Sequence, residues 1–282
     1  MKWFIRSAVV ILVFAAAGLV FAGNYFYQYA FVPAPKDFLA DEEPVDSGKV
    51  DPAQSWFTGK TRSRWQIISD DGLRLSAIYL PAADPQQKTA ILAHGYMGNA
   101  ETMWQFAHMY HELGYDVLVP DARGHGESEG NYIGFGWPER KDYLKWIDKV
   151  LLEKGQKEKI TLYGISMGGA TVMNTSGEQL PDNVFAIIED CGYASIKDEL
   201  IYQYKELFDL PTFPVIQMTN LVTRLRAGFF FTDGDVRQQL AKNKTPILFI
   251  HGTADTFVPF SMLGEVYAAT DAPKERWEVS GA

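Results

Sequence analysis

One stretch near the middle of the chain limits the possible folds more than any other. Residues 160–163 are apolar or β-favouring and predict a short buried strand. The sequence Gly-Ile-Ser-Met-Gly of residues 164–168 follows at once, and Gly169 and Ala170 continue with small residues that suit a helix packed close to a strand. This order predicts a sharp strand-to-helix turn that lifts the hydroxyl of Ser166 above a sheet.

A serine at such a turn can act as a nucleophile, because the helix N-terminus beneath it places positive partial charge where an oxyanion would form. Side chains two positions to either side would clash within the turn, which accounts for Gly164 and Gly168. The spacing G-x-S-x-G arises by chance in roughly one chain in ten of this length, so its weight comes from the strand before it and the helix after it.

After residue 62 the chain alternates strands with helices. Such β-α-β units predict an α/β fold, with a mostly parallel sheet, helices on both faces and functional loops at the carboxyl ends of the strands. The expected strands cover residues 65–69, 73–80, 89–93, 116–119, 160–163, 184–188, 247–250 and 276–279, and the expected helices include residues 101–113, 138–154 and 261–269.

One segment interrupts the alternation. Residues 193–244 lie between two expected strands and are too many for an ordinary crossover. Their aromatic content indicates a helical cap that roofs an apolar pocket. These aromatic residues are Tyr202, Tyr204, Phe208, Phe213, Phe229, Phe230 and Phe231.

Residues 1–32 form a separate apolar segment, which we expect to lie outside the fold. Lys2 and Arg6 precede an uncharged run that is long enough to span a membrane. The length favours an uncleaved anchor, and the alternative is a signal peptide cleaved after residues 20–22. Either way the basic residues stay inside, so we expect the remaining chain to be extracytoplasmic, held at the cell membrane or, in the alternative, secreted.

Residues 33–60 are acidic and punctuated by prolines, and they predict a solvated linker. Residues 61–282 remain as the folded domain.

Charge and cysteine content exclude several kinds of partner. The net charge of -9 argues against nucleic acid, which requires a basic face. Cys191 is the one cysteine of the sequence, so neither a disulfide framework nor a cysteine-built zinc site can form. The histidines show no metal-binding spacing and the glycines at 124–130 form no dinucleotide fingerprint, so we expect no metal and no cofactor.

Four motifs occur in a fixed order from about residue 62 onward. With them the chain resembles the α/β-hydrolase superfamily, and it is most similar to bacterial membrane-anchored or secreted serine hydrolases of the cell surface. The motifs are His94-Gly95-Tyr96, Asp121-x-Arg123-Gly124-His125-Gly126-x-Ser128, Gly164-x-Ser166-x-Gly168, and His251-Gly252-x-x-Asp255-x-x-Val258-Pro259.

The resemblance implies a Ser-Asp-His triad with Ser166 as the nucleophile and Asp255 as the acid. It also implies that the backbone N–H groups of Met167 and Tyr96 bind the oxyanion. Asp190, which also ends an expected strand, is an alternative acid, although a local hydrogen-bonding role suits it better.

The triad histidine has no counterpart in the sequence, because no histidine follows Asp255. The family places this base after the last strand, commonly behind a Gly-Ala pair, and residues 281–282 are such a pair. We therefore expect a C-terminally truncated chain that is inactive without the base, with a true pseudoenzyme as the alternative. The histidines present are expected to brace loops (His94, His125, His251) or to be solvated on a helix (His108, His111).

Together these features favour a serine hydrolase that acts on small-molecule carboxylic esters or other acyl substrates by acyl transfer. A serine peptidase of the aminopeptidase kind is the first alternative. A non-catalytic binding module of the cell surface is the second, if the chain really ends at Ala282.

Overall fold

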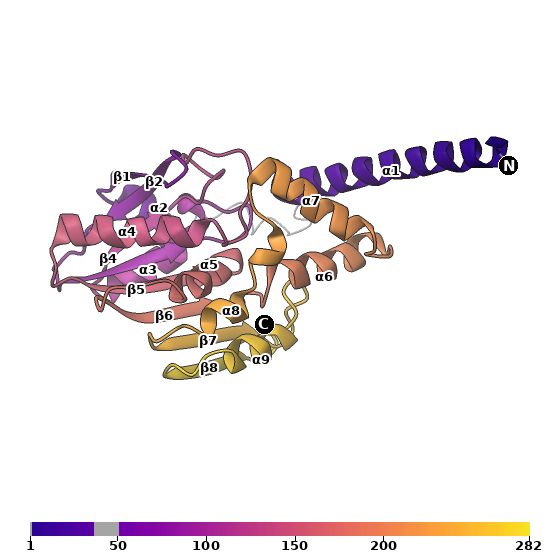
Figure 1. Cartoon of the computed structure of the whole chain (residues 1–282). Coiled ribbons are helices and arrows are strands. Elements are labelled where there is room, and N and C mark those ends of the chain that lie inside the picture. The colour runs from indigo at the N-terminus through magenta and orange to yellow at the C-terminus, as the bar shows by residue number, and fades with distance from the viewer. Residues whose placement is uncertain (1, 37–50) are drawn as a thin grey trace.

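The computed structural model describes residues 2–36 and 51–282, and within them eight strands form one sheet in the order β1-β2-β4-β3-β5-β6-β7-β8 (Figure 1). Strand β2 is antiparallel to β1 and β4, and the remaining neighbours are parallel. The strands are β1 (Ser63–Ile68), β2 (Arg74–Leu80), β3 (Lys88–Ala93), β4 (Asp116–Pro120), β5 (Lys159–Ile165), β6 (Val184–Asp190), β7 (Ile247–Gly252) and β8 (Lys274–Val279).

Helices cover both faces of this sheet, as the alternation of elements predicts. In β3, Ile91 belongs to one buried cluster with Trp146 of α4, while Leu92 belongs to the opposite cluster with Phe57 of α2. Successive strand side chains point to opposite faces, so each strand joins the two cores. The first face carries α4 (Glu139–Lys154), α5 (Met167–Ser176), α8 (Val236–Leu240) and α9 (Ser261–Ala268), and the second carries α2 (Pro52–Gly59), the 3-10 turn η2 (Ala100–Met103) and α3 (Trp104–Glu112).

The prediction that residues 33–60 form a solvated linker is wrong at its end, because residues 52–59 form helix α2. Asp51 caps this helix by accepting a hydrogen bond from the backbone N–H of Ala53, and proline at the first helical position favours the same start. Phe57 is fully buried, so this segment belongs to the domain. Residues 37–50 of the expected linker lie outside the described part.

Helix α2 also covers His111, which the sequence predicts to be solvated. The residue is only 8% exposed, so that prediction is wrong. The indole of Trp56 lies 4.8 Å from its ring, so α2 covers this end of α3.

The N-terminal segment is a single helix, α1 (Lys2–Phe31), long and apolar enough to cross a membrane. It projects from the domain over most of its length (Figure 1). The expectation that it lies wholly outside the fold is wrong for its last third, because Gly23, Tyr27 and Phe31 are buried against the domain. Their four-residue spacing places them on one face of the helix.

The expected cap carries α6 (Ile196–Phe208), α7 (Val215–Ala227) and the short 3-10 turn η3 (Phe231–Asp233), followed by α8. α7 lies alongside α1, and α6 lies beneath them (Figure 1). Not every aromatic residue of the cap contributes to a roof: Phe213 is 73% exposed and Phe230 is 37% exposed.

Candidate active site

Ser166 lies at the bend between β5 and α5, with backbone angles φ 54° and ψ −117° that residues other than glycine rarely adopt. Its N–H donates to the carbonyl of Asp190 at 2.8 Å, which fixes the bend against β6. A Cβ at Gly164 would lie 2.0 Å from the carbonyl oxygen of Gly168, and one at Gly168 would lie 2.0 Å from that of Ala93. Only glycine fits at both positions, so the backbone itself holds the serine in place.

The loop after β3 lies beside this bend. A Cβ on Gly95 would contact the Cβ of Ser166 at 3.5 Å. The N–H of Gly98 donates to the carbonyl of Gly95 at 3.0 Å and closes a tight turn, in which Met97 takes a left-handed conformation with φ 58°. Tyr96 therefore lies in a short turn next to Ser166.

His94 braces that loop, as predicted. Its Nδ1 donates to the carbonyl of Gly95 at 2.8 Å when its Nε2 accepts from the N–H of Ala122 at 3.0 Å. Burial, together with His125 beside it, lowers the pKa of His94 to about 3. With both ring nitrogens engaged, the neutral ring is not available as a general base.

Asp121 joins the neighbouring loops at the same sheet edge. Its carboxylate accepts hydrogen bonds from the backbone N–H groups of Ala100 at 2.7 Å and Glu127 at 3.0 Å. Arg123, two residues on, forms a two-pronged pair with Asp142 of α4 at 2.8 and 2.9 Å. These bonds explain the charged residues of the second motif as supports for the loops.

Asp255 lies in the loop after β7. Its Oδ1 accepts from the N–H groups of Phe257 at 2.8 Å and Val258 at 2.9 Å, and its Oδ2 lies 3.4 Å from Nε2 of His251. Partial burial opposes ionisation, but His251 and the two amides outweigh it and lower the pKa of Asp255. His251 also donates to the carbonyl of Val258 at 3.0 Å, so it braces the acid loop as predicted.

Asp190 ends β6 beside Ser166, and Cys191 follows it. Asp190 accepts a hydrogen bond from the hydroxyl of Tyr163 at 2.8 Å, the local role expected for it. Burial, reinforced by Asp190, raises the pKa of the Cys191 thiol and keeps it protonated at neutral pH.

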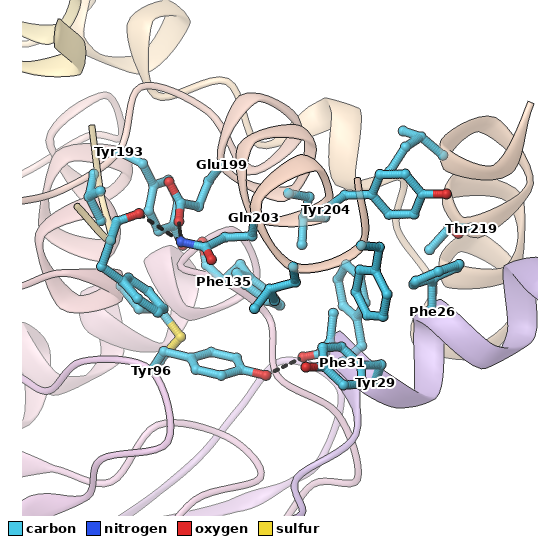
Figure 2. Close-up of a pocket in the computed structure, with 18 of the residues that line it drawn as sticks. Phe26, Tyr29, Phe31, Tyr96, Phe135, Tyr193, Glu199, Gln203, Tyr204 and Thr219 are labelled. Atoms are coloured by element: carbon cyan, nitrogen blue, oxygen red, sulfur yellow. Dashed lines mark hydrogen bonds between the residues drawn. The ribbon is translucent and has the colours of Figure 1, made fainter. Parts of the chain in front are cut away.

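An apolar pocket (Figure 2) opens beside the bend, and Ser166 and Met167 belong to its lining. Phe257 and Val258 border the same pocket, so the loop of Asp255 reaches it as well. The sequence-predicted residues Ser166, Met167 and Tyr96 all line it, whereas Asp255 is not among the lining residues.

The pocket contains one carboxyl group that sequence reasoning missed, that of Glu199 on α6. This residue is 4% exposed, and its Oε1 accepts a hydrogen bond from Gln203 at 3.0 Å. Burial raises the pKa of Glu199 to about 8 against the opposing hydrogen bond from Gln203. At neutral pH the side chain is therefore mostly neutral. Glu199 lies in the first turn of α6, where acidic residues are common because they stabilise the start of a helix. The sequence alone therefore gives no sign that this residue belongs to the pocket.

Helix α1 is the second part of the site that sequence reasoning missed, and it lines the pocket with Phe26, Tyr29, Ala30 and Phe31 (Figure 2).

Among residues 2–36 and 51–282, no group of three or more His, Cys, Asp or Glu residues is arranged to hold a metal ion. The site thus combines a strained serine, a tight backbone turn beside it and an apolar chamber.

Comparison with known proteins shows the family to which the chain belongs. The family model described as serine aminopeptidase, S33, matches residues 84–224, half of the chain. The chain is an S33-family α/β hydrolase. The match spans the first three motifs and continues into the cap.

Similar proteins align with most of the length of this hydrolase. It is similar to the uncharacterized Bacillus subtilis protein YqkD, with 26% identity over 259 residues that cover 92% of this chain and 83% of that protein. Its fold is similar to that of the Pyrococcus furiosus esterase Pf2001, with a TM-score of 0.63, 24% identity and 89% of each chain covered. It is also similar to Est1E from Butyrivibrio proteoclasticus, solved with ferulic acid, with a TM-score of 0.59 and 21% identity over 77% of this chain and 89% of that one.

Proposed function

We propose that this hydrolase cleaves carboxylic esters by acyl transfer, with Ser166 as the nucleophile. The serine oxygen attacks the ester carbonyl, the backbone N–H groups of Met167 and Tyr96 bind the oxyanion, and the alcohol leaves with a proton. Water then cleaves the acyl-serine bond and releases the acid. Asp255 orients the histidine that carries these protons.

The bend at Ser166 is the observation that carries this proposal. A left-handed serine that opens into an apolar chamber, at the N-terminus of α5, has no structural need for its hydroxyl. The two amides would contribute about 3 kcal/mol each to transition-state stabilisation.

The proposal keeps the base in the loop after β8, where the family resemblance puts it. The carbonyl of Ala282 accepts a hydrogen bond from the N–H of Ala254 at 2.7 Å, so this loop starts beside Asp255. Translating the gene past the codon for Ala282 tests this part. A histidine within the next few codons supports the triad, and a stop codon at that point supports the binding module instead.

The nucleophile is tested by covalent labelling. A fluorophosphonate probe should label the protein expressed from its complete gene, and Ser166→Ala should abolish labelling. Cys191→Ser is the matched control, since it changes the neighbouring nucleophilic side chain and should leave labelling unchanged. Labelling that persists in Ser166→Ala would refute the assignment.

Aminopeptidase activity is the second candidate, favoured by the family description and by the Glu199 carboxyl in the pocket. The raised pKa of Glu199 and the aromatic walls favour a neutral ester over a cationic peptide terminus. A panel of p-nitrophenyl esters and aminoacyl amides separates the two, because faster turnover of the amides would reverse our order.

We also propose that α1 anchors the protein in the cell membrane, with the hydrolase domain outside the cytoplasm. Its length, its apolar composition and the basic residues Lys2 and Arg6 at its start support this. Sodium carbonate extraction of membranes should leave the protein in the pellet, whereas a cleaved signal peptide would release it.

A further inference from the structure

Helix α1 is a wall of the pocket as well as a tether. The ring of Phe26 lies 4.8 Å from that of Tyr204 and 4.9 Å from that of Phe208, both on α6. The hydroxyl of Tyr96, beside the bend at Ser166, donates to the carbonyl of Ala30 at 2.8 Å (Figure 2). The last turns of α1 are thus hydrogen-bonded directly to the loop that borders Ser166.

Close packing fixes this wall in position. A Cβ at Gly23 would lie 2.5 Å from the Cγ of Met218 on α7, so the two helices touch at backbone distance. Further along, the guanidinium of Arg226 stacks 5.1 Å from the ring of Tyr27. At the end of α1 the N–H of Ile133 donates to the carbonyl of Phe31 at 2.7 Å. A loose tether would make none of these contacts.

The same contacts set the direction of the cap relative to the exposed part of α1. Gly23 lies beside Met218, and Tyr27, further along α1, lies beside Arg226, further along α7. Because the residue numbers increase in the same direction along both helices, α1 and α7 run parallel. At 1.5 Å per residue, the start of α7 lies level with about residue 20 of α1. The connection between α6 and α7 therefore reaches toward the projecting part of α1, as Figure 1 shows.

This connection exposes two large apolar side chains, next to the exposed Asp209. Phe213 is 73% exposed and Leu210 is 51% exposed. Residues 2–21 of α1 are about 30 Å long, the thickness of the hydrocarbon layer, so a membrane crossed by them would meet this tip of the cap. Exposed apolar side chains at that level suit a lipid surface.

The pocket extends from the serine to this tip. On α6 it is lined by Glu199, Leu200, Gln203, Tyr204, Leu207 and Phe208, one helical face about 14 Å long. Leu207 lines the pocket and is also 39% exposed, so the lining reaches the surface at the membrane-proximal end.

We propose that the pocket binds the long acyl chain of a membrane lipid ester, which enters between α1 and the end of α6 from the lipid layer. The proposal rests on the function proposed above and names its substrate class. Ser166 would take the acyl group from the lipid alcohol, and water would release the fatty acid. An apolar chamber walled by aromatic rings matches a methylene chain, and its membrane-proximal end faces the layer that stores such chains.

The test uses the protein from its complete gene in phosphatidylcholine vesicles, with p-nitrophenyl palmitate and p-nitrophenyl acetate as substrates. Ala30→Trp fills the wall of the pocket and should lower kcat/KM for the palmitate about tenfold or more, while the acetate changes less than about twofold. Ala16→Trp is the matched control, since it adds the same side chain to the exposed part of α1 and should leave both substrates unchanged.

A readout on the wild-type protein covers the case that Ala30→Trp misfolds. Vesicle phosphatidylcholine with a diazirine at the end of its acyl chain should crosslink to Tyr204 and Phe208 on illumination. Prior reaction of Ser166 with a long-chain fluorophosphonate should block this crosslink.

The outcomes separate the two proposals. If Ser166 is labelled normally but Ala30→Trp lowers kcat/KM equally for both substrates, the lipid proposal alone is overturned. Crosslinks that avoid α6 would overturn it as well. Absence of fluorophosphonate labelling would overturn the ester hydrolase, and the lipid substrate with it.

Discussion

The floor of the pocket, formed by residues 94–98 and 164–168, is held by its backbone, whereas its roof, formed by α1, α6 and α7, is held by side chains. In the floor, backbone carbonyls stand where a Cβ at Gly164 or Gly168 would have to lie. In the roof, rings such as Phe26 and Phe208 meet edge to face at 4.9 Å. The floor therefore accepts almost no change, while the roof can be repacked to suit different substrates.

The largest effect is expected where the floor has least room. Gly168→Ala should destabilise the protein by about 4 kcal/mol or more, because its Cβ would overlap the carbonyl of Ala93. Urea unfolding in detergent micelles measures this. Gly264→Ala is the matched control, since no atom lies within 4 Å of the added Cβ on α9, and it should stabilise by about 0.5–1 kcal/mol. Equal effects of the two substitutions would contradict the tight packing of the floor.

The second effect concerns the buried carboxyl of the roof. The folded pKa of Glu199, about 8, lies above its unfolded value, so the folded state holds the proton more tightly. Wild-type stability should fall as the pH rises from about 4.3 to about 8, where the unfolded chain has already released this proton. Glu199→Gln should therefore be clearly more stable than wild type at pH 9 and nearly equal to it at pH 4. Parallel stability curves for the two proteins would contradict the raised pKa.

The smallest effect tests the bond that joins floor to roof. Tyr96→Phe removes the hydrogen bond to the carbonyl of Ala30 and should cost about 1 kcal/mol in urea unfolding. Tyr202→Phe is the matched control, because its bond to the carbonyl of Thr256 is exposed and its loss should stay within about 0.5 kcal/mol. A Tyr96→Phe protein as stable as the control would mean that floor and roof are not coupled through this hydroxyl.

The same contrast separates what the sequence predicts from what it does not. The sheet, its flanking helices and the position of Ser166 between β5 and α5 follow from local patterns, and the structure confirms this α/β-hydrolase fold. Strand boundaries differ by only one or two residues in most cases, as for β5 at 159–165 against the expected 160–163. Such patterns are local, since alternation and glycine spacing act within a few residues.

The roof depends on contacts between distant segments. Nothing near Phe26 indicates that it meets Tyr204, because an apolar run long enough for a membrane has no polar face from which a packing side could be recognised. The four-residue spacing of Gly23, Tyr27 and Phe31 is the one signal that could have shown it. For α2, the Asp51 cap followed by proline was a readable helix start.

The pairing of α1 with α7 has a consequence for the order of biosynthesis. Asn24 and Arg226 are hydrogen-bonded across 202 positions of the chain, so α1 leaves the ribosome long before its partner helix α7 is made. The catalytic chamber can therefore close only after the nucleophile and strands β1 to β6 have been synthesised.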